Sequence, residues 1–457
     1  MSFPGNFKTR MQNLLGKDEW NDFAEALQQA PPVSIRYNRH KNAAPQDADK
    51  VAWCAMGRYL TTRPAFTLDP LLHAGAYYVQ EASSMFLEQA AVLWRGQTGL
   101  RFLDLCAAPG GKSTHLADLT PAGSMLVSNE VIRSRTAALS ENLTKWGNPN
   151  TVITHNDPKD FASLPDFFDV MLIDAPCSGE GLFRKEPAAV EAWSEAHVKH
   201  CAERQRRIVS DAWDALKEEG LLLYSTCTYN REENENNIRW MTQQLGAEVV
   251  HIPLQAAWNI TTNEYGYRFF PHKTKGEGFF ISLLRKKGRS LSSASPMSSP
   301  PKPFSRGERG GFLPSLSGEG PGVRTAPAWL NGDFTFVREG FYIYALPDYL
   351  VHDVFHLQQH LRFLQAGVKV GEVKGAGVVP AAALALSAAL RNDAFPCADV
   401  DLATALRFLR REALALPHIE KGYCIIRYQH LPLGFVKNIG ARSNNLHPPA
   451  WRIRMNI

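Results

Sequence analysis

The chain has 457 residues, beyond the size at which one hydrophobic core usually divides, so two or three domains are expected. Its 44% hydrophobic and 21% charged residues are typical of a soluble globular protein, and no apolar run approaches the roughly 20 residues of a membrane span. The formal charge of +5 does not by itself indicate nucleic-acid binding. Residues 285–324 carry eight Lys or Arg and two Asp or Glu, a net of +6, which leaves 5 − 6 = −1 for the rest.

The first block, residues 1–75, is predicted to be helical at its start and then polar. Apolar residues in MQNLL and FAEAL recur at helical spacing, and no secretory hydrophobic stretch is present, so we expect a cytoplasmic protein. A basic and aromatic cluster lies next along the chain, comprising Arg36, Tyr37, Arg39, His40 and Lys41. Such a cluster suits phosphate contact with base stacking, and a solvated basic surface is an equally good interpretation.

The second block, residues 76–285, alternates short apolar runs with helical patterns. Strands are expected at 100–106, 124–128, 151–155, 168–174 and 221–227. The alternation predicts βαβ units and a parallel sheet covered on both faces, a Rossmann-like α/β fold. Two further runs, 248–254 and 278–284, have no helix between them and are expected to close a seven-stranded sheet as an antiparallel edge pair.

The last two blocks differ sharply in composition. Residues 286–327 are rich in Ser, Pro and Gly without periodicity, which predicts a flexible low-complexity linker and does not favour rigid docking of the C-terminal block. Residues 328–457 resume with mixed strand-like and helical stretches, typical of an α+β accessory domain. The final 37 residues, from Lys421, hold six Lys or Arg and no acid, which favours RNA contact over a merely solvated surface.

A loop of small residues in FLDLCAAPGGKSTHLADL connects a predicted buried strand to a helix that starts near Lys112. It consists of Cys106, Ala107, Ala108, Pro109, Gly110 and Gly111. Glycines let the backbone approach a ligand closely, and Glu130, at the next strand end, could accept hydrogen bonds from both ribose hydroxyls. Asp157, after the third strand, could bond an adenine amino group, although either acid alone could be a capping residue. The G-x-G-x-x-G and Walker patterns are missing, so an adenosyl ligand without phosphates fits better than NAD or ATP.

Two cysteines come directly after neighbouring predicted strands. The chain has seven cysteines, an odd number at irregular spacing, which argues against a disulfide framework and shows no metal-ligand pairing. Cys177 lies just after the fourth strand, together with Asp174, and Cys227 lies just after the fifth. Since the carboxyl ends of such strands face the same crevice as the cofactor loop, a catalytic role is favoured over core packing.

A thiol, a carboxylate and an adenosyl cofactor together suit methylation of carbon 5 of cytosine. A thiolate that adds to carbon 6 turns carbon 5 into an enamine-like nucleophile, and a carboxylate near the ring nitrogen steadies the developing charge. A second thiol or a base can then assist loss of the carbon 5 proton and expulsion of the first thiol. On this chemistry alone, either cysteine could be the nucleophile.

Four motifs in this order resemble the Nop/Sun family of RNA 5-methylcytosine methyltransferases: YYVQEASSM, FLDLCAAPGGKSTHLA, DAPCSGEG and YSTCTYNREENE. The resemblance implies S-adenosylmethionine as cofactor, contacted by residues from Cys106 to Lys112 and by Glu130, Asp157 and Asp174. Asp174 matches the acid that also meets the target base. Cys227 matches the nucleophile, and Cys177 matches the cysteine that promotes product release. Lys112 either reaches the active site or only opens its helix.

The segments FLQAGVKVGEV and LPLGFVKN are similar to the ribosomal RNA methyltransferase F branch, whose C-terminal region is PUA-like. This narrower resemblance implies an RNA-binding extension (1–75), a methyltransferase domain (76–285), a linker (286–327) and a PUA-like RNA-binding region (328–457). We expect 16S ribosomal RNA as the substrate. We also expect the protein to act as a monomer and to need no metal ion. Transfer RNA is the alternative substrate, and a non-catalytic ribosome assembly factor is the alternative class.

Overall fold

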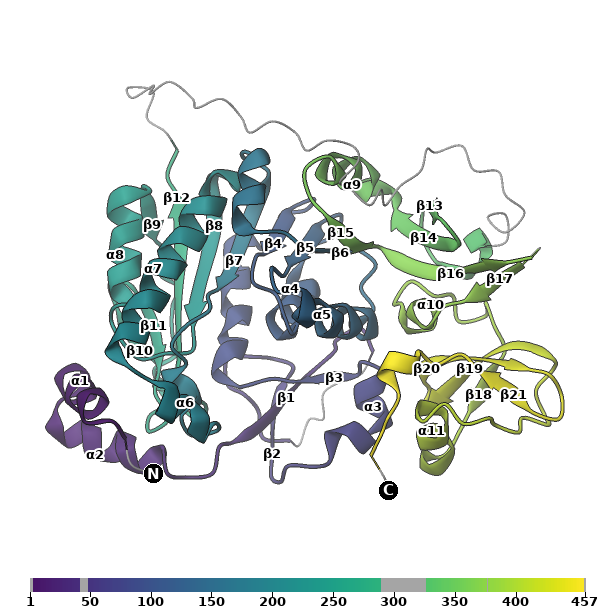
Figure 1. Ribbon diagram of the computed structural model, residues 1–457, viewed down its shortest axis with the longest axis horizontal. Coiled ribbons are helices and arrows are strands. Elements are labelled where there is room, and N and C mark those ends of the chain that lie inside the picture. The colour runs from purple at the N-terminus through teal and green to yellow at the C-terminus, as the bar shows by residue number, and fades with distance from the viewer. Residues whose placement is uncertain (1–2, 42–47, 289–325, 376, 456–457) are drawn as a thin grey trace.

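The computed structural model describes residues 3–41, 48–288, 326–375 and 377–455 (Figure 1). The predicted linker at 286–327 falls almost entirely outside these residues, so its character stays a prediction. Within the described part of the chain, no helix is both long and apolar enough to cross a membrane.

The centre of the structure is a ten-stranded sheet with the strand order β10-β11-β12-β8-β7-β4-β5-β6-β15, with β9 paired to β12. Its parallel strands are β4 (Arg101–Asp104), β5 (Met125–Asn129), β6 (Thr151–Thr154), β7 (Phe168–Asp174) and β8 (Leu216–Thr226). Each corresponds to one of the five apolar runs in the sequence, because buried parallel strands need apolar side chains on both faces. The α/β, Rossmann-like fold class is therefore confirmed.

The antiparallel edge is larger than the expected pair. It contains β9 (Ala247–Val249), β10 (Thr261–Asn263), β11 (Gly266–Phe269) and β12 (Phe279–Lys286). The predicted pairing exists, since Leu284 faces Val249, but β12 also pairs along its length with β8, and the β10–β11 hairpin adds two further strands. The count of seven was therefore too small.

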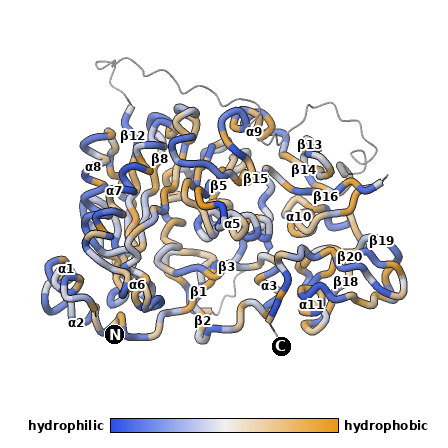
Figure 2. Tube along the Cα trace, viewed as in Figure 1, coloured by the Kyte–Doolittle hydropathy of each residue, from blue (hydrophilic) through white to orange (hydrophobic). Residues whose placement is uncertain are grey.

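Helices cover both faces of the sheet. They are α4 (Gly111–Leu119), α5 (Arg133–Trp146), α7 (Glu195–Ala212) and α8 (Glu235–Gln244), whereas the short α6 (Pro187–Ala192) packs with the N-terminal helices through Val190. Successive strand residues alternate between two cores: Leu103 packs with Ile208 of α7, whereas Phe102 packs with Leu116 of α4. Hydrophilic and hydrophobic residues alternate along α7 and α8, as expected for helices with one face on a sheet (Figure 2).

The N-terminal block forms α1 (Gly5–Leu15), α2 (Lys17–Ala26), α3 (Pro70–His73) and an antiparallel sheet of β1 (Val33–Tyr37), β2 (Gly57–Leu60) and β3 (Tyr77–Val79). The two predicted helices are present, but the sheet was not predicted. Phe7 and Phe23 of the helix pair share a core with Phe183 and Tyr229, so the block is packed against the segments that come after β7 and β8.

The C-terminal block has two four-stranded sheets. The first contains β13 (Phe334–Glu339), β14 (Tyr342–Pro347), β16 (Val368–Lys374) and β17 (Gly377–Pro380). The second contains β18 (Cys397–Asp399), β19 (Gly422–Tyr428), β20 (Leu431–Asn438) and β21 (Ser443–Asn445). With α9 (Val351–Gln358), α10 (Ala382–Leu386) and α11 (Leu402–Leu409), they form the expected α+β arrangement.

This block is not loosely attached, contrary to the expectation drawn from the low-complexity segment. Strand β15 (Phe363–Ala366) pairs with β6 and so extends the central sheet. Val354 of α9 packs into the core of the sheet, and Arg101 of β4 forms an ion pair with Asp353. The composition of a connecting segment does not determine the contacts that the residues after it can make, which is why the expectation was wrong.

Candidate active site at the carboxyl ends of the parallel strands

The small-residue loop runs from β4 into α4 as predicted. Gly110 has φ 115°, a conformation that favours glycine, and a Cβ at Gly111 would lie 3.1 Å from the ring of Tyr78. Helix α5 supports the loop, because the side-chain amide of Asn142 donates to the Pro109 carbonyl at 2.8 Å. The glycines therefore allow close packing of the loop between Tyr78 and α5.

Glu130 lies at the end of β5 with 2% of its surface exposed. Its Oε1 accepts a hydrogen bond from the Ile132 backbone N–H at 2.8 Å. Its Oε2 is buried and makes no hydrogen bond among the described residues, although Arg135 Nη1 lies 3.4 Å away. A buried carboxylate oxygen normally has a hydrogen-bond partner, so this acceptor fits a ribose hydroxyl.

Asp157 has a structural role that the sequence had left open. It caps the short 3-10 helix η3 (Pro158–Ser163), and its Oδ1 accepts from the Lys159 backbone N–H at 3.2 Å. The neighbouring Asn156 bonds both backbone groups of Arg362 and so links the cofactor edge to the C-terminal block. The adenine contact of Asp157 stays a prediction.

Asp174 and Lys112 meet at the carboxyl ends of the parallel strands. Lys112 Nζ lies 2.8 Å from Asp174 Oδ2, and the Ser225 hydroxyl donates to Asp174 Oδ1 at 2.7 Å. Burial lowers the pKa of Lys112, but the charge and hydrogen bond of Asp174 outweigh it and the net pKa is raised. Lys112 is therefore a cation that reaches the end of β7, besides lying in the first turn of α4.

Asp104, at the end of β4, was not singled out from the sequence. The Ser113 hydroxyl donates to its Oδ2 at 2.6 Å, whereas its Oδ1 is buried without a hydrogen-bond partner among the described residues. Burial, together with the negative charge of Asp174, raises the pKa of Asp104 to about 7. Only its place at the end of a strand, shortly before Cys106, could have indicated it.

Cys177 and Cys227 are adjacent, with their sulfur atoms 3.0 Å apart and both thiols free. The backbone N–H of Cys227 also points at Cys177 Sγ, at 3.4 Å. The hydrogen bond with Cys227, together with burial, raises the pKa of Cys177 well above its ordinary value. Burial likewise raises the pKa of Cys106 in the cofactor loop, and the charges of Asp104 and Asp174 add to the effect.

Glu180 holds the backbone that comes after Cys227. Its Oε2 accepts from the Thr228 hydroxyl at 2.7 Å and from the backbone N–H groups of Tyr229 and Asn230 at 2.9 Å. Its Oε1 accepts from the Trp193 indole at 2.9 Å.

Glu233 holds the segment around Cys177 by accepting hydrogen bonds in the same way. Its Oε2 accepts from the Ser178 backbone N–H at 3.0 Å and from the Gln205 amide at 2.7 Å. Both glutamates belong to the family motifs, but nothing in the sequence indicated that they would be buried and positioning.

Two of the cations in the basic cluster near residue 36 are bonded to groups inside the protein. Arg36 is fully buried, and its guanidinium donates to Asp118 Oδ2 at 2.7 Å. Lys41 Nζ donates to the Ala74 carbonyl at 2.8 Å. The RNA interpretation is therefore wrong for these two cations, because β1 packs against α4 and gives Arg36 an internal partner, while Arg39 and His40 are exposed.

Cys54, Glu88 and His115 have possible metal-ligand atoms within 4.8 Å of one another. Their spacing along the chain shows no metal pattern. The Cys54 thiol donates to Glu88 Oε2 at 3.0 Å, and His115 Nε2 lies 3.3 Å from the same oxygen. The Ala55 backbone N–H donates to the other oxygen of Glu88 at 3.0 Å, whereas Nδ1 of His115 is buried without a hydrogen-bond partner among the described residues.

The geometry defines a class of protein. Two buried carboxyl oxygens without hydrogen-bond partners among the described residues, Glu130 Oε2 and Asp104 Oδ1, flank a glycine loop at the carboxyl edge of a Rossmann-like sheet, and the same edge carries a thiol pair. This is the arrangement of an S-adenosylmethionine-dependent methyltransferase.

Comparison with known proteins identifies the family. Family models match residues 91–285 (16S rRNA methyltransferase RsmB/F), 3–82 (N-terminal domain of 16S rRNA methyltransferase RsmF) and 395–453 (methyltransferase RsmF PUA domain). Ribosomal RNA small subunit methyltransferase F of Escherichia coli O157:H7 is 31% identical, over 98% of this chain and 96% of its own length. The protein of the same name from Erwinia tasmaniensis is 32% identical, also over 98% and 96%.

The chain belongs to the ribosomal RNA small subunit methyltransferase F family. The predicted family, its cofactor S-adenosylmethionine and the PUA-like C-terminal domain are thus confirmed. Among solved structures, a methyltransferase homologue from Pyrococcus horikoshii is 29% identical with a TM-score of 0.53, over 62% of this chain and 96% of its own. NSun6 from Pyrococcus horikoshii with SFG has a TM-score of 0.53 at 20% identity, over 63% and 99%, and shows a shared fold.

Proposed function

We propose that the chain methylates carbon 5 of cytosine in RNA, with 16S ribosomal RNA as the substrate. The observation that carries the proposal is the thiol pair, Cys177 and Cys227, beside the Lys112–Asp174 ion pair. Methylation at a nitrogen or oxygen atom needs no protein nucleophile, whereas carbon 5 of cytosine must first be activated by addition at carbon 6.

In the proposed mechanism, Cys227 is the nucleophile. Its thiolate adds to carbon 6 of the base. Asp174 accepts a hydrogen bond from the exocyclic amine beside ring nitrogen 3, and the ammonium of Lys112 offsets the negative charge that develops on that side of the ring. When bound, S-adenosylmethionine supplies the methyl group that carbon 5 then takes. The loop from Cys106 to Lys112 would hold this cofactor, with Glu130 at the ribose and Asp157 at the adenine.

Cys177 assists the release of product. After the proton on carbon 5 has left to a base, the carbon–sulfur bond to Cys227 breaks and the sulfur leaves as a thiolate. A protonated Cys177 thiol, 3.0 Å away, can donate a hydrogen bond to that developing anion. The assignment of these two roles follows the family motifs, in which Cys227 matches the nucleophile and Cys177 matches the cysteine that promotes product release.

The flanking blocks fit an RNA substrate that must be opened at the target. A base can reach the crevice only when it is unstacked, so a loop or flexible site is expected. The N-terminal helix pair and the second C-terminal sheet lie at the lower left and lower right of the molecule (Figure 1). We propose that both blocks bind RNA, and that the protein acts as a cytoplasmic monomer.

The test supplies methyl-labelled S-adenosylmethionine with small ribosomal subunits, naked 16S ribosomal RNA or transfer RNA, each from cells that lack the enzyme. Each RNA is digested to nucleosides, and the labelled nucleoside is identified by mass spectrometry. Labelled 5-methylcytidine from the ribosomal samples is expected. Labelled 5-methylcytidine in transfer RNA only would support the proposed chemistry but identify transfer RNA as the substrate. No label in any RNA would favour a non-catalytic assembly factor.

A further inference from the structure

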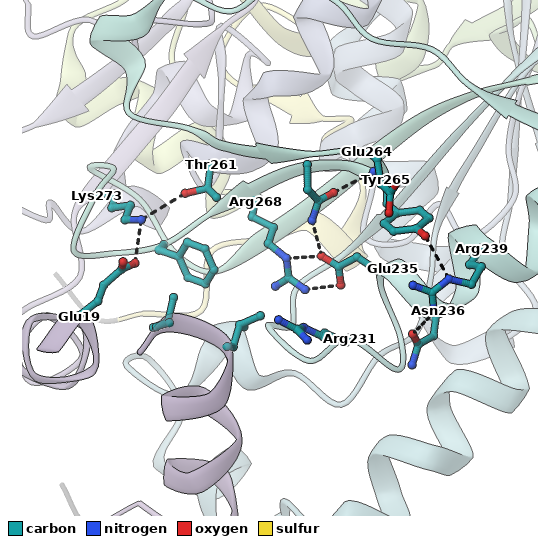
Figure 3. A pocket seen from close by; sticks show the side chains of 14 residues that line it. Glu19, Arg231, Glu235, Asn236, Arg239, Thr261, Glu264, Tyr265, Arg268 and Lys273 are labelled. Atoms are coloured by element: carbon teal, nitrogen blue, oxygen red, sulfur yellow. Dashed lines mark hydrogen bonds and ion pairs between the residues drawn. The ribbon is translucent and has the colours of Figure 1, made fainter. Parts of the chain in front are cut away.

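A polar cavity of about 530 Å³ lies outside the crevice, between the N-terminal helix pair, the start of α8 and the β10–β11 hairpin (Figure 3). Neither the cofactor loop nor the thiol pair contributes to it. The cavity nevertheless begins close to them in the chain, since Arg231 is four residues beyond Cys227. Its size falls within the range of pockets that hold a small ligand or one nucleotide.

The cations that line this cavity are of two kinds. Arg268 forms a buried ion pair with Glu235, and Lys273 lies 2.7 Å from Glu19, so these two cations have acidic partners. In contrast, Arg231 is exposed, and in the described part of the chain its side chain makes no hydrogen bond or ion pair (Figure 3).

Arg239 is the second cation without an acidic partner in the described ranges. Its guanidinium bonds only neutral groups, the Tyr265 hydroxyl at 3.0 Å and Asn236 Oδ1 at 3.3 Å. It also lies over the Tyr265 ring, 5.2 Å from the centroid. Glu264 also lines the cavity, as do Glu19 and Glu235. The cavity lining therefore has four cationic side chains and three carboxylates, a net charge of 4 − 3 = +1.

A second cavity, of about 380 Å³, adjoins the first and shares Leu14, Arg231 and Asn236 with it. It is also lined by Glu180 and Asn230, which belong to the hydrogen-bonded loop after Cys227. Arg231 thus lies between the loop of the nucleophile and the larger cavity. A nucleic-acid strand that leaves the crevice on this side would pass Arg231 first and Arg239 next.

We propose that the larger cavity binds the phosphodiester backbone of the RNA strand beside the target cytosine. Arg231 and Arg239 contact phosphates, because a guanidinium presents paired N–H donors that match phosphate oxygens, and the Tyr265 ring contacts the adjoining ribose or base. The inference rests on the proposed function and deepens it by assigning where the flanking strand is held.

The test measures binding of full-length chain to transcribed 16S ribosomal RNA over a series of salt concentrations. Arg231→Gln and Arg239→Gln should each weaken binding about fivefold and reduce the salt slope by about 1, as expected for one lost phosphate contact. Glu264→Gln should act in the opposite direction and tighten binding about twofold, because it removes a repulsive charge. The matched control is Arg285→Gln, a half-exposed arginine at the far end of β12.

Unchanged affinity and salt slope in both arginine variants would overturn the proposal, as would tighter binding of an acidic peptide than of RNA. If Arg239→Gln lowers the unfolding temperature, the result with Arg231→Gln alone tests the proposal, since the Arg231 side chain makes no hydrogen bond or ion pair with the described residues. Methyl transfer is measured separately with the same proteins. Loss of RNA affinity in the variants, with no methylation by any form including wild type, would leave this site standing and refute the proposed function.

Discussion

The two halves of the active site differ in how completely their acidic side chains are paired. Around the thiols, Glu180 and Glu233 accept hydrogen bonds through both oxygens. Around the cofactor loop, Glu130 Oε2 and Asp104 Oδ1 are buried with no hydrogen-bond partner in the described ranges. The difference indicates that the thiol half is built before any ligand arrives, whereas the cofactor half is completed by its ligand.

The strongest way to test the thiol half is to remove one sulfur at a time. Cys227→Ala should abolish methyl transfer and form no covalent adduct with RNA, because carbon 6 then has no nucleophile. Cys177→Ala should accumulate a protein–RNA adduct that survives denaturing electrophoresis, since the departing sulfur loses its hydrogen-bond donor. An adduct in the Cys227 variant and none in the Cys177 variant would reverse the two roles.

Glu180→Gln tests whether the loop after Cys227 must be held before ligand arrives. The amide is similar in size but replaces one acceptor oxygen by a donor, which conflicts with at least one of the N–H groups that Glu180 now accepts from. We expect methyl transfer to fall about a hundredfold and the free energy of unfolding to fall by about 2 kcal/mol.

Binding of S-adenosylmethionine, measured by calorimetry, is the control for Glu180→Gln and should change little. A comparable loss of cofactor affinity would mean that the two halves are not independent. Lys8→Gln, at an exposed position of α1, is a control variant that leaves the loop after Cys227 unchanged.

Asp104→Asn tests the half that awaits its ligand. Because the pKa of Asp104 is raised to about 7 by burial, the folded protein keeps this proton while the unfolded chain releases it near pH 4. Its contribution to stability is therefore full below pH 4 and is lost as pH rises toward 7. Asparagine does not titrate, so the variant should not lose stability in this way. The difference in unfolding free energy, variant minus wild type, should therefore rise by a few kcal/mol between about pH 4 and pH 7.

The comparison with wild type is needed because buried histidines contribute the opposite slope. Burial lowers the pKa of His73, His115 and His447 to about 4, so they stabilise the fold as pH rises. These terms cancel in the difference between the two proteins. A pH-independent difference would show that Asp104 is already ionised in the folded chain.

Much of this fold was predictable because its signals are local. Five apolar runs marked the parallel strands, and glycines marked the cofactor loop. The β1–β3 sheet was missed because its strands are short and include Arg36, whose acidic partner lies 82 residues away along the chain. Strand β15 was missed for the same reason, since its pairing with β6 is long-range.

The candidate site likewise has residues that local sequence signals indicate and residues that only the fold reveals. Cys177, Cys227 and Asp174 were predictable because each lies at the end of a strand, at the same edge of the sheet. Glu233 could not be distinguished from the other two glutamates of NREENE, nor Glu180 from an exposed acid, since burial is decided by the surrounding fold. Asp104 was hidden for a similar reason: its importance comes from an unpaired oxygen, which no pattern of residues shows.

Asp157→Ser should have the smallest effect and makes the sharpest distinction between the two halves. Serine is as good a helix cap as aspartate, so it should keep the bond to the Lys159 N–H and leave the unfolding free energy within about 0.5 kcal/mol of wild type. It removes the carboxylate that is proposed to meet the adenine amino group, which should weaken S-adenosylmethionine binding about threefold to tenfold. Calorimetric titration measures the affinity, and S-adenosylhomocysteine should lose the same factor, because the adenine is common to both ligands. Unchanged affinity for both would make Asp157 a cap alone and would leave Glu130 and Asp104 as the acids that await the cofactor.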